Sequence, residues 1–419
     1  MTMVLRYRRH LKFGAIVRTA SAPRTTPCDV TPPTIVHLGA GNFHRSHQAA
    51  YLDALADPAW TICAVGTRRS DVAVRDAMRA RDCRYTLRLL HADGRVEVST
   101  VASIREYVFA PDEVGVLMAR LTAPSTRIVS LTVTEGGYVG NDALFGLLVD
   151  ALERRRTAGV APFTVVSCDN IVHNGAVARD ALLGACADDA TRGWITENVA
   201  FPSSMVDRIT PATPGGDASV VIAEPFAQWV LEDDFPTGRP PLERVGVQLV
   251  ADVEPYEQMK LRLLNGAHQA MAYEGLLRGH TYVHDAMRDP VIVALLRDYF
   301  AETRPTVPPV PGIDLDAYCA TLLQRFANPY IADTLARLAA FTHDRIPIFV
   351  LPAVLDNLRA ARPVDTAARV CAAAVRFLGV ADPEWLAEVR GVPAFADAFA
   401  AAMVAGTSSR VSDFWGSPR

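Results

Sequence analysis

Lysine is almost absent from this chain of 419 residues. Among its 42 basic side chains only Lys12 and Lys260 are lysines, so arginine serves wherever a generic positive charge is needed. Arginine stays protonated in proteins, whereas lysine can lose its proton when it is desolvated. Lys260, the one lysine in the body of the chain, is therefore a candidate for chemistry. The alternative is an ordinary surface lysine that has survived by chance.

Three further absences narrow the class of protein. The seven cysteines are scattered, odd in number and never spaced C-x-x-C, which argues against a zinc ribbon or a disulfide framework and favours a reducing, cytoplasmic setting. No apolar run approaches the roughly 18 residues that span a bilayer. The net charge of −4 is too small for a dedicated binder of nucleic acid or anionic membrane. We therefore expect neither of those partners, and a monomer or weak oligomer.

The length of the chain and its 50% hydrophobic content are enough for two domains with sizeable cores. The first 28 residues hold six basic side chains and no acidic one. They lack the apolar segment and cleavage site of a targeting peptide. We expect residues 1–32 to form a loose N-terminal extension.

The remaining chain divides by its hydrophobic pattern. Short apolar runs at 34–38, 61–65, 127–133 and 163–167 indicate buried strands, and helical stretches at 44–55, 71–81 and 141–155 separate them. This alternation is typical of a parallel, doubly wound sheet. After a last strand at 245–253 the pattern is helical, with candidates at 255–277, 290–303, 315–326, 329–341, 366–378 and 383–389. We predict an α/β domain over residues 33–252 and an α-helical domain over residues 253–419, with the active site between them.

A glycine-rich turn joins the first strand to the first helix. It contains Gly39, Ala40, Gly41, Asn42, Phe43 and Arg45. Glycines at this place let a backbone approach a pyrophosphate, which the N-terminus of the helix attracts. The third glycine of the usual fingerprint is absent, so an ordinary tight turn remains the alternative. The position after the first strand favours a dinucleotide-binding, Rossmann-like domain.

A second cluster lies on the predicted helix 255–277. Glu257, Lys260, Asn265 and His268 fall within an arc of about 140° if each residue turns the helix by about 100°. The neighbouring positions are apolar, so these polar groups predict a buried, wet pocket rather than a salt-bridged surface stripe. Desolvation would let a lysine amine act as a base near neutral pH. An asparagine amide can hold an alkoxide or carbonyl oxygen, and a histidine can orient the substrate hydroxyl.

Two weaker signals accompany these clusters. Asn170 follows the strand at 163–167, and ligands gather at the carboxyl ends of strands in an open α/β sheet. A plain asparagine turn is the alternative. The adjacent charges of Asp207 and Arg208 belong either to the site or to a structural ion pair.

In combination these segments resemble the long-chain polyol dehydrogenases, the family of mannitol 2-dehydrogenase and the hexuronate reductases. The resemblance covers roughly residues 34–350 in family order. It rests on IVHLGAGNFHRSHQAAYLDAL (35–55), LTVTEGGY (131–138), FTVVSCDNIVHNG (163–175), FPSSMVDRITP (201–211), EPFAQWVLEDDF (224–235), YEQMKLRLLNGAHQAMAY (256–273) and RFANPYIADTLARL (325–338).

The resemblance implies a role for each matching residue. Lys260 corresponds to the general base, Asn170 and Asn265 to the pair that stabilises the oxyanion, His268 to the histidine that orients the substrate, and Glu257 to the acid that governs proton exit. It also implies NAD or NADP as cofactor and no metal. Residues expected near the cofactor are Gly39 to Phe43, Arg45, Arg68, Thr134 and Asp207.

The substrate is expected to be a neutral polyol, mannitol- or arabinitol-like, oxidised at C2 to its ketose. Arg337 and Arg345 are the side chains expected to bind it. Ile348 stands where family members often carry lysine or glutamine, and an apolar group there solvates a carboxylate poorly. A hexuronate reductase nevertheless remains the alternative, because either arginine could hold a carboxylate.

Three other classes compete with this interpretation. Tyr256 and Lys260 match the Tyr-x-x-x-Lys pair of short-chain dehydrogenases, but that family lacks a second helical domain. A zinc polyol dehydrogenase is disfavoured because no Cys/His/Glu set has ligand spacing. The non-enzymatic alternative is a nicotinamide-binding sensor with a dead site, and the intact Lys/Asn/His set argues against it. Near the end of the second predicted strand Arg68 and Arg69 precede Asp71, so we expect NAD first and leave NADP open.

Overall fold

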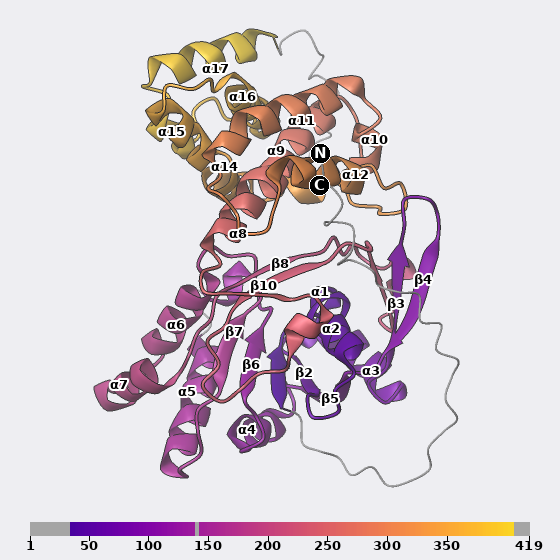
Figure 1. Ribbon diagram of the computed structural model, residues 1–419, viewed down its shortest axis with the longest axis vertical. Coiled ribbons are helices and arrows are strands. Elements are labelled where there is room, and N and C mark those ends of the chain that lie inside the picture. The colour runs from indigo at the N-terminus through magenta and orange to yellow at the C-terminus, as the bar shows by residue number, and fades with distance from the viewer. Residues whose placement is uncertain (1–33, 139–141, 406–419) are drawn as a thin grey trace, which may run out of the picture. The chain divides into compact units, whose positions relative to one another are not determined.

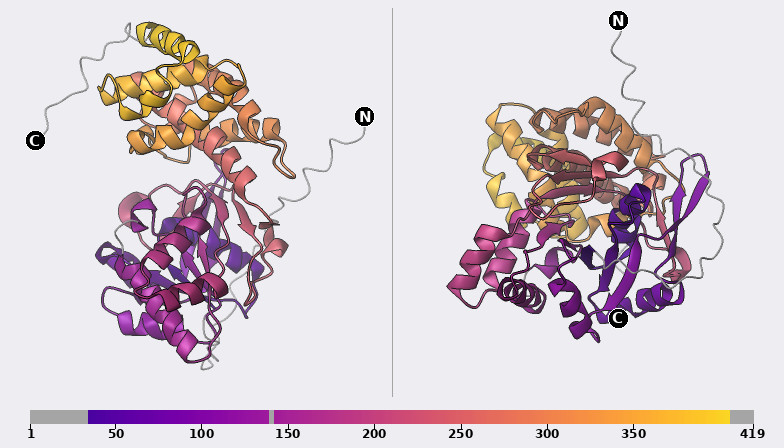
Figure 2. Two further views of the ribbon diagram at one scale, coloured as in Figure 1. Left: turned by 90° about the vertical axis from the view of Figure 1, so that its left-hand side faces the viewer. Right: turned by 60° about the horizontal axis from the view of Figure 1, so that its bottom comes forward.

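The computed structural model describes residues 34–138 and 142–405, so the predicted N-terminal extension and Lys12 lie outside the described residues. The chain divides into two compact units (Figures 1 and 2). The first consists of residues up to 88 together with 98–223 and 227–253. The second consists of residues from 254 onward together with 89–97 and 224–226. No helix in the described part of the chain is long and apolar enough to cross a membrane.

The first unit is built on a parallel five-stranded sheet whose strand order is β5-β2-β1-β6-β7. The strands are β1 (Ile35–Leu38), β2 (Ile62–Gly66), β5 (Ile104–Phe109), β6 (Ile128–Leu131) and β7 (Thr164–Ser167). The helices around it are α1 (Asn42–Ser46), α2 (Gln48–Leu55), α3 (Val72–Ala80), α4 (Val114–Thr122), α5 (Asp142–Thr157), α6 (Asn174–Gly184) and α7 (Asp189–Asn198). This arrangement confirms the predicted doubly wound α/β fold.

Side chains alternate across β1 and so face two different environments. Val36 and Leu38 join the hydrophobic core that α4, α5 and α6 complete on one face of the sheet. His37 points the other way, toward the first helix, where its ring stacks on His44. Both faces of the sheet are covered, which explains why every residue of β1, β2, β6 and β7 is buried.

The strand order reverses between β1 and β6. The chain passes from β1 outward to β2 and β5, and then returns to place β6 and β7 on the other side of β1. The carboxyl ends of β1 and β6 lie side by side, because Leu38 pairs with Leu131. Ligands of open α/β sheets bind at such a switch point. The glycine turn and the loop after β6 both begin there.

The described residues also form two small three-stranded sheets, and of their strands only the one at 245–253 was predicted. In one, β10 (Gln228–Glu232) pairs antiparallel with β8 (Ser204–Asp207) and parallel with β11 (Gln248–Val250). In the other, β3 (Tyr85–Leu90) lies between β4 (Val96–Val101) and β9 (Val220–Ala223). The predicted strand 245–253 is thus real only over its three central residues.

The second unit is helical, as predicted. Its main helices are α8 (Glu254–Met259), α9 (Gly266–Leu277), α10 (Val283–Ala286), α11 (Pro290–Thr303), α12 (Leu315–Phe326), α13 (Leu335–Ala339), α14 (Thr342–Phe349), α15 (Leu351–Arg359), α16 (Asp365–Leu378) and α17 (Pro393–Ala405). Residues Lys260–Asn265 form a π-helix between α8 and α9. The predicted helix 255–277 is therefore present, but a π-helical segment interrupts it between two α-helical ones.

The predicted helix 329–341 was largely wrong, because only Leu335–Ala339 is helical. The side chain of Asn328 explains the late start: it accepts the amide of Tyr330 at 3.1 Å and donates to the Leu90 carbonyl at 2.8 Å. The helix begins only after Thr334, whose hydroxyl accepts the amide of Arg337. Residues Glu384–Glu388 form a 3₁₀-helix, and α17 was not predicted.

Candidate active site

The glycine turn after β1 requires its first glycine. Gly39 has φ of +96°, and a Cβ there would collide with the backbone carbonyl of Thr132. Only glycine combines this backbone conformation with so close an approach. The turn is further fixed by the amides of Gly39 and Ala40, which donate to the Val65 carbonyl at 3.0 and 3.1 Å.

Gly41 is different, because nothing in the fold requires it. Its φ is −81°, and a Cβ there would meet only the Gly39 carbonyl, at 3.9 Å. A glycine that is free of steric demand leaves open space in front of the backbone. Close approach of a pyrophosphate needs such space, so the turn fits a dinucleotide.

A buried histidine stabilises the turn through the side chain of Thr132. His37 Nε2 lies 2.8 Å from Thr132 Oγ1, and its Nδ1 lies 2.8 Å from Ser130 Oγ. Thr132 donates its proton to the Gly39 carbonyl at 2.7 Å, so it must accept from His37. The network therefore places the proton of the neutral imidazole on Nε2. Burial lowers the pKa of His37 to about 3.

Arg45, which we expected to contact the cofactor, is almost fully buried within its own unit. Its guanidinium donates to the Ala218 carbonyl at 2.5 Å and to Asn42 Oδ1 at 2.6 Å, and lies over the ring of Tyr85. These bonds tie the glycine turn to the loop before β9. A contact of Arg45 with the cofactor stays a prediction, whereas its bonds to the turn are directly visible.

The carboxyl end of β2 carries Arg68, an exposed side chain. Its Nη2 donates to Val133 O at 3.3 Å and to Thr134 Oγ1 at 3.2 Å, which links β2 to the loop after β6. Asp71, the nearest acid, accepts the backbone amide of Arg68 at 2.9 Å. Two residues expected near the cofactor, Arg68 and Thr134, thus lie together at the switch point.

The loop after β6 is held by one carboxylate at the end of β7. Asp169 accepts the amides of Val133 and Thr134 at 3.0 and 2.8 Å, and the hydroxyl of Tyr138 at 2.7 Å. These bonds stabilise Thr134 in a left-handed conformation, with φ of +66°. Asn170, the next residue along the chain, is exposed at the same edge of the sheet. Asp207 is buried at the end of β8.

The predicted polar cluster of the second unit is buried. The exposed fractions are 5% for Glu257 and 8% for each of Lys260, Asn265 and His268. Around them the helix is apolar, since Met259, Leu263, Leu264 and Ala267 belong to the core. Four polar side chains buried on one apolar helix are uncommon in a purely structural setting.

The π-helix changes the geometry expected for this cluster. In a regular α-helix, five steps of about 100° would place Asn265 roughly 140° around the axis from Lys260. In a π-helix the hydrogen bonds run from residue i to i+5, so residues five apart lie one above the other. The π-helix therefore brings Lys260 and Asn265 into line, which the uniform α-helix of our prediction could not do.

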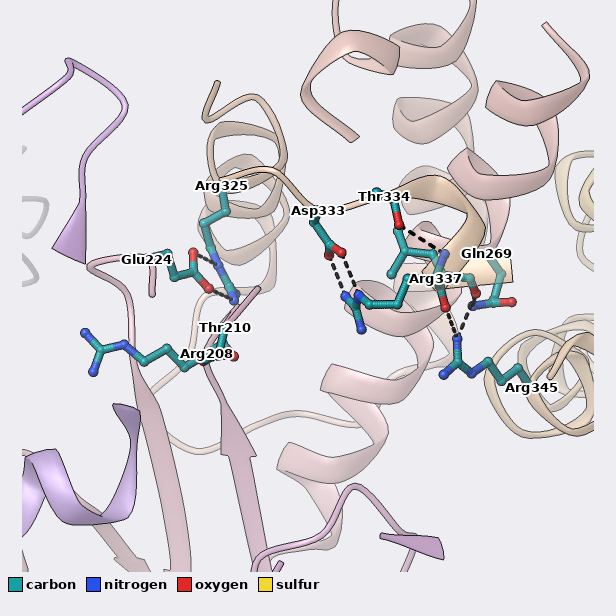
Figure 3. A network of polar contacts seen from close by, with 10 residues as sticks. Arg208, Thr210, Glu224, Gln269, Arg325, Asp333, Thr334, Arg337 and Arg345 are labelled. Atoms are coloured by element: carbon teal, nitrogen blue, oxygen red, sulfur yellow. Dashed lines mark hydrogen bonds and ion pairs between the residues drawn. The ribbon is translucent and has the colours of Figure 1, made fainter. Parts of the chain in front are cut away.

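His268 is positioned by α12. Its ring packs against Phe326 with 4.6 Å between the ring centroids. The preceding residue, Arg325, forms a buried bidentate ion pair with Glu224 at 2.7 and 3.0 Å (Figure 3). Its Cζ atom also lies 3.9 Å from the centroid of the Phe226 ring. Residues 224–226 thus hold the end of α12 that supports His268.

The two arginines predicted to bind substrate already have partners within the second unit (Figure 3). Arg337 makes two bonds to the carboxylate of Asp333, at 2.6 and 2.5 Å. Arg345 Nη1 donates to the carbonyls of Arg337 and Leu338 at 3.1 and 2.8 Å. Ile348 is 43% exposed. Contact of either arginine with substrate stays a prediction.

Comparison with known families decides the membership of this chain. Residues 33–244 match the mannitol dehydrogenase Rossmann domain, and residues 252–387 match the mannitol dehydrogenase C-terminal domain. The chain belongs to the mannitol dehydrogenase family. The family resemblance predicted from the sequence motifs is thereby confirmed.

Individual relatives agree with this membership of the mannitol dehydrogenase family. Mannitol dehydrogenase 2 of Saccharomyces cerevisiae is 41% identical over 378 residues, which cover 80% of this chain and 75% of the relative. Mannitol 2-dehydrogenase of Pyrenophora tritici-repentis is 40% identical over 392 residues, which cover 82% and 69%.

Two solved structures are also similar. The complex of Pseudomonas fluorescens mannitol 2-dehydrogenase with NAD and D-mannitol is 38% identical, with a TM-score of 0.80 and coverage of 90% of this chain and 92% of that one. A substrate-free D-sorbitol dehydrogenase is 36% identical, with a TM-score of 0.76 and coverage of 83% and 80%.

Sequence reasoning missed several residues that organise the site in this member of the mannitol dehydrogenase family. Asp169 lies next to Asn170, but its bonds reach 35 and 36 residues back and have no local signature. The Glu224–Arg325 pair spans 101 residues. Both partners lie in segments that carried the family resemblance, EPFAQW and RFANPY. The family motifs therefore marked these two residues, although their distance in sequence gave no reason to pair them.

Proposed function

We propose that this protein is a metal-independent dehydrogenase that interconverts a polyol and its 2-ketose with NAD. One observation carries the proposal: the helix of the second unit buries a lysine, an asparagine, a histidine and a glutamate on one apolar element. This set offers a base and hydrogen-bond donors for a single oxygen atom. It contains no serine, threonine or cysteine that could act as the nucleophile of an acyl transfer.

Each side chain has a distinct task in this proposal. The amine of Lys260 accepts the hydroxyl proton as a secondary alcohol becomes a ketone. Asn265, aligned with it by the π-helix, donates its amide to the oxygen that develops charge, and Asn170 is assigned the same task from the end of β7. His268, fixed by Phe326, orients the hydroxyl. Glu257 passes the proton toward solvent.

The residues at the switch point fit a dinucleotide. Gly41 leaves space before the backbone, and Gly39 to Phe43, Thr134 and Asp207 are the residues we assign to its binding. A bound nicotinamide supplies hydride acceptance. The relative solved with NAD supports NAD as the cofactor. NADP remains the alternative, since the exposed Arg68 could contact a 2′-phosphate.

A neutral polyol is favoured over a hexuronate. Recognition of a substrate carboxylate needs a cation, and the charge of Arg337 is already matched by Asp333 (Figure 3). Relatives named for mannitol and sorbitol support the same choice. Among the described residues no cluster of three His, Cys, Asp or Glu could hold a metal ion.

The decisive experiment replaces Lys260 by alanine and, separately, by arginine. Arginine keeps the charge but cannot accept a proton, so both variants should lose about 10²–10⁴-fold or more in turnover. Turnover is followed by NADH absorbance with D-fructose and with D-fructuronate. Binding of NADH, measured by its fluorescence, should be unchanged in both variants.

Three results would contradict the proposal in different ways. Near-normal turnover in Lys260→Arg would remove the lysine as base. Higher kcat/KM for D-fructuronate than for D-fructose in the unaltered protein would replace the polyol by a hexuronate. Binding of NADH without turnover of any ketose would favour the catalytically inactive sensor.

A further inference from the structure

The π-helix between α8 and α9 leaves one carbonyl without its usual helical partner. In an α-helix the carbonyl of Arg262 would accept the amide of Gly266, four residues on. Here that amide donates instead to the carbonyls of Leu261 and Leu263. The Arg262 carbonyl needs a donor from elsewhere, because a buried carbonyl without a hydrogen bond is destabilising.

Tyr299 supplies that donor. It lies on α11, is completely buried, and its hydroxyl donates to the Arg262 carbonyl at 3.0 Å. The bond joins residues 37 positions apart in the sequence. A side chain from another helix therefore replaces the hydrogen bond that the π-helix gives up.

Gly266 makes room for this hydroxyl. A Cβ at Gly266 would collide with the Tyr299 hydroxyl and would lie 3.0 Å from the Phe349 carbonyl. The backbone of Gly266 is helical, with φ of −63°, so no conformational demand explains the glycine. What requires a glycine is the approach of the tyrosine.

The side chain of Arg262 adds a second anchor. Its Nη1 donates to the Thr306 carbonyl at 2.5 Å and to Asp356 Oδ2 at 2.7 Å. Residue 262 is thus held at its carbonyl by α11 and at its guanidinium by α15. Both anchors act on the middle of the segment that separates Lys260 from Asn265.

We propose that Tyr299 is a positioning residue whose hydroxyl maintains the π-helix and so keeps Lys260 and Asn265 aligned. Without the hydroxyl, the Arg262 carbonyl recovers the Gly266 amide and the segment returns to α-helical geometry. Asn265 then rotates about the axis by up to roughly 140° relative to Lys260. The proposal rests on the proposed function, in which both side chains act on one oxygen.

The test is Tyr299→Phe, which removes only the hydroxyl. The matched control is Tyr273→Phe, another fully buried tyrosine of the same unit, whose hydroxyl bonds to Gln269 Oε1 at 2.5 Å instead of to the π-helix. Both variants lose one buried hydrogen bond and should lose similar stability. Only Tyr299→Phe should disturb the alignment of Lys260 with Asn265.

Turnover is measured with D-mannitol and with D-mannitol deuterated at C2. In Tyr299→Phe we expect kcat to fall roughly 10- to 100-fold, because misplacement of a reacting group by about 1 Å has effects of that size. The deuterium isotope effect on kcat should rise as hydride transfer becomes rate-limiting. The Kd of NADH should stay within about twofold, and Tyr273→Phe should keep both kcat and the isotope effect.

Asp356→Asn provides a second variant, since Asp356 lies near the surface and its replacement does not disturb the core. It should change kcat and the isotope effect in the same direction by a few-fold. The proposal is overturned if each folded variant of Tyr299 and Asp356 matches Tyr273→Phe in both measurements. That failure is distinct from failure of the proposed function, which near-normal turnover of Lys260→Ala would reveal.

Discussion

The buried ion pair between Glu224 and Arg325 offers the sharpest test of how the second unit is held together. Its side chains are only 3% and 5% exposed, and the two hydrogen bonds measure 2.7 and 3.0 Å. Removing one partner of such a pair leaves an uncompensated buried charge, which typically costs about 3–5 kcal/mol. Replacing both by apolar residues of similar size is often close to neutral.

These magnitudes define a double-mutant cycle. Glu224→Leu and Arg325→Met should each lower the free energy of unfolding by about 3–5 kcal/mol, and the double variant by no more than about 2 kcal/mol. The coupling energy should then be at least about 4 kcal/mol. Glu224→Leu should be the milder single change, because the guanidinium keeps its position over the ring of Phe226, worth about 1 kcal/mol.

Urea unfolding followed by far-ultraviolet circular dichroism measures the cycle. The pair is internal to the second unit, so only the transition of that unit should move if the two units unfold separately. Additive losses, with a coupling energy below about 0.5 kcal/mol, would refute the reasoning, since independent sites behave in that way. The KM for polyol should also rise in both single variants, because Phe326 next to Arg325 supports His268.

Two further predictions concern the switch point. Gly39→Ala should destabilise the first unit severely, because the Cβ meets the Thr132 carbonyl, whereas Gly41→Ala should leave thermal unfolding unchanged and weaken NADH binding measured by fluorescence titration. Equal effects of Gly39→Ala and Gly41→Ala on stability and on NADH binding would contradict the proposal that the space in front of Gly41 is occupied by the cofactor. Stability should also fall with pH below about 6.5, by about 1 kcal/mol per pH unit for His37, because the unfolded chain takes up a proton there while the buried imidazole does not until about pH 3. Burial also lowers the pKa of His44, which adds to the loss of stability. Urea midpoints that stay constant between pH 7.5 and 5 would contradict the burial of His37 and His44 as neutral imidazoles.

The sequence predicted most accurately the features that depend on local pattern. The strands β1, β2, β6 and β7 were recognised because each is a short apolar run between turn signals. Most strands of the two small sheets were missed, because they lack the continuous burial of the parallel strands, as in the mostly exposed β4, or pair with distant parts of the chain, as β9 does with β3. Periodicity also overextended the helix at 329–341, where the side chain of Asn328 keeps the backbone out of helical geometry.

In the candidate site, too, the residues with a local sequence signal were predicted and those that act through distant contacts were not. Lys260 stood out by composition, and its three polar neighbours by their position on one predicted helix. Their burial agrees with the pocket we expected, while their catalytic roles stay predictions. The residues that fix the backbone in each unit were not predictable. Asp169 holds the loop after β6 in the first unit and Tyr299 holds the π-helix in the second, each through bonds to residues 35 to 37 positions away.

The spacing of Glu257, Lys260, Asn265 and His268 contains a signal that uniform α-helical geometry does not explain. These residues lie three, five and three residues apart, and steps of three keep side chains on one face of an α-helix, whereas a step of five does not. A base and an amide that must meet at one oxygen cannot tolerate a rotation of roughly 140° between them. If the cluster is functional, the middle step requires a π-helix, and the π-helix in turn requires a donor for the carbonyl it exposes. Tyr299 is that donor. The alignment that the reaction requires of Lys260 and Asn265 therefore also depends on a third residue, which lies on another helix.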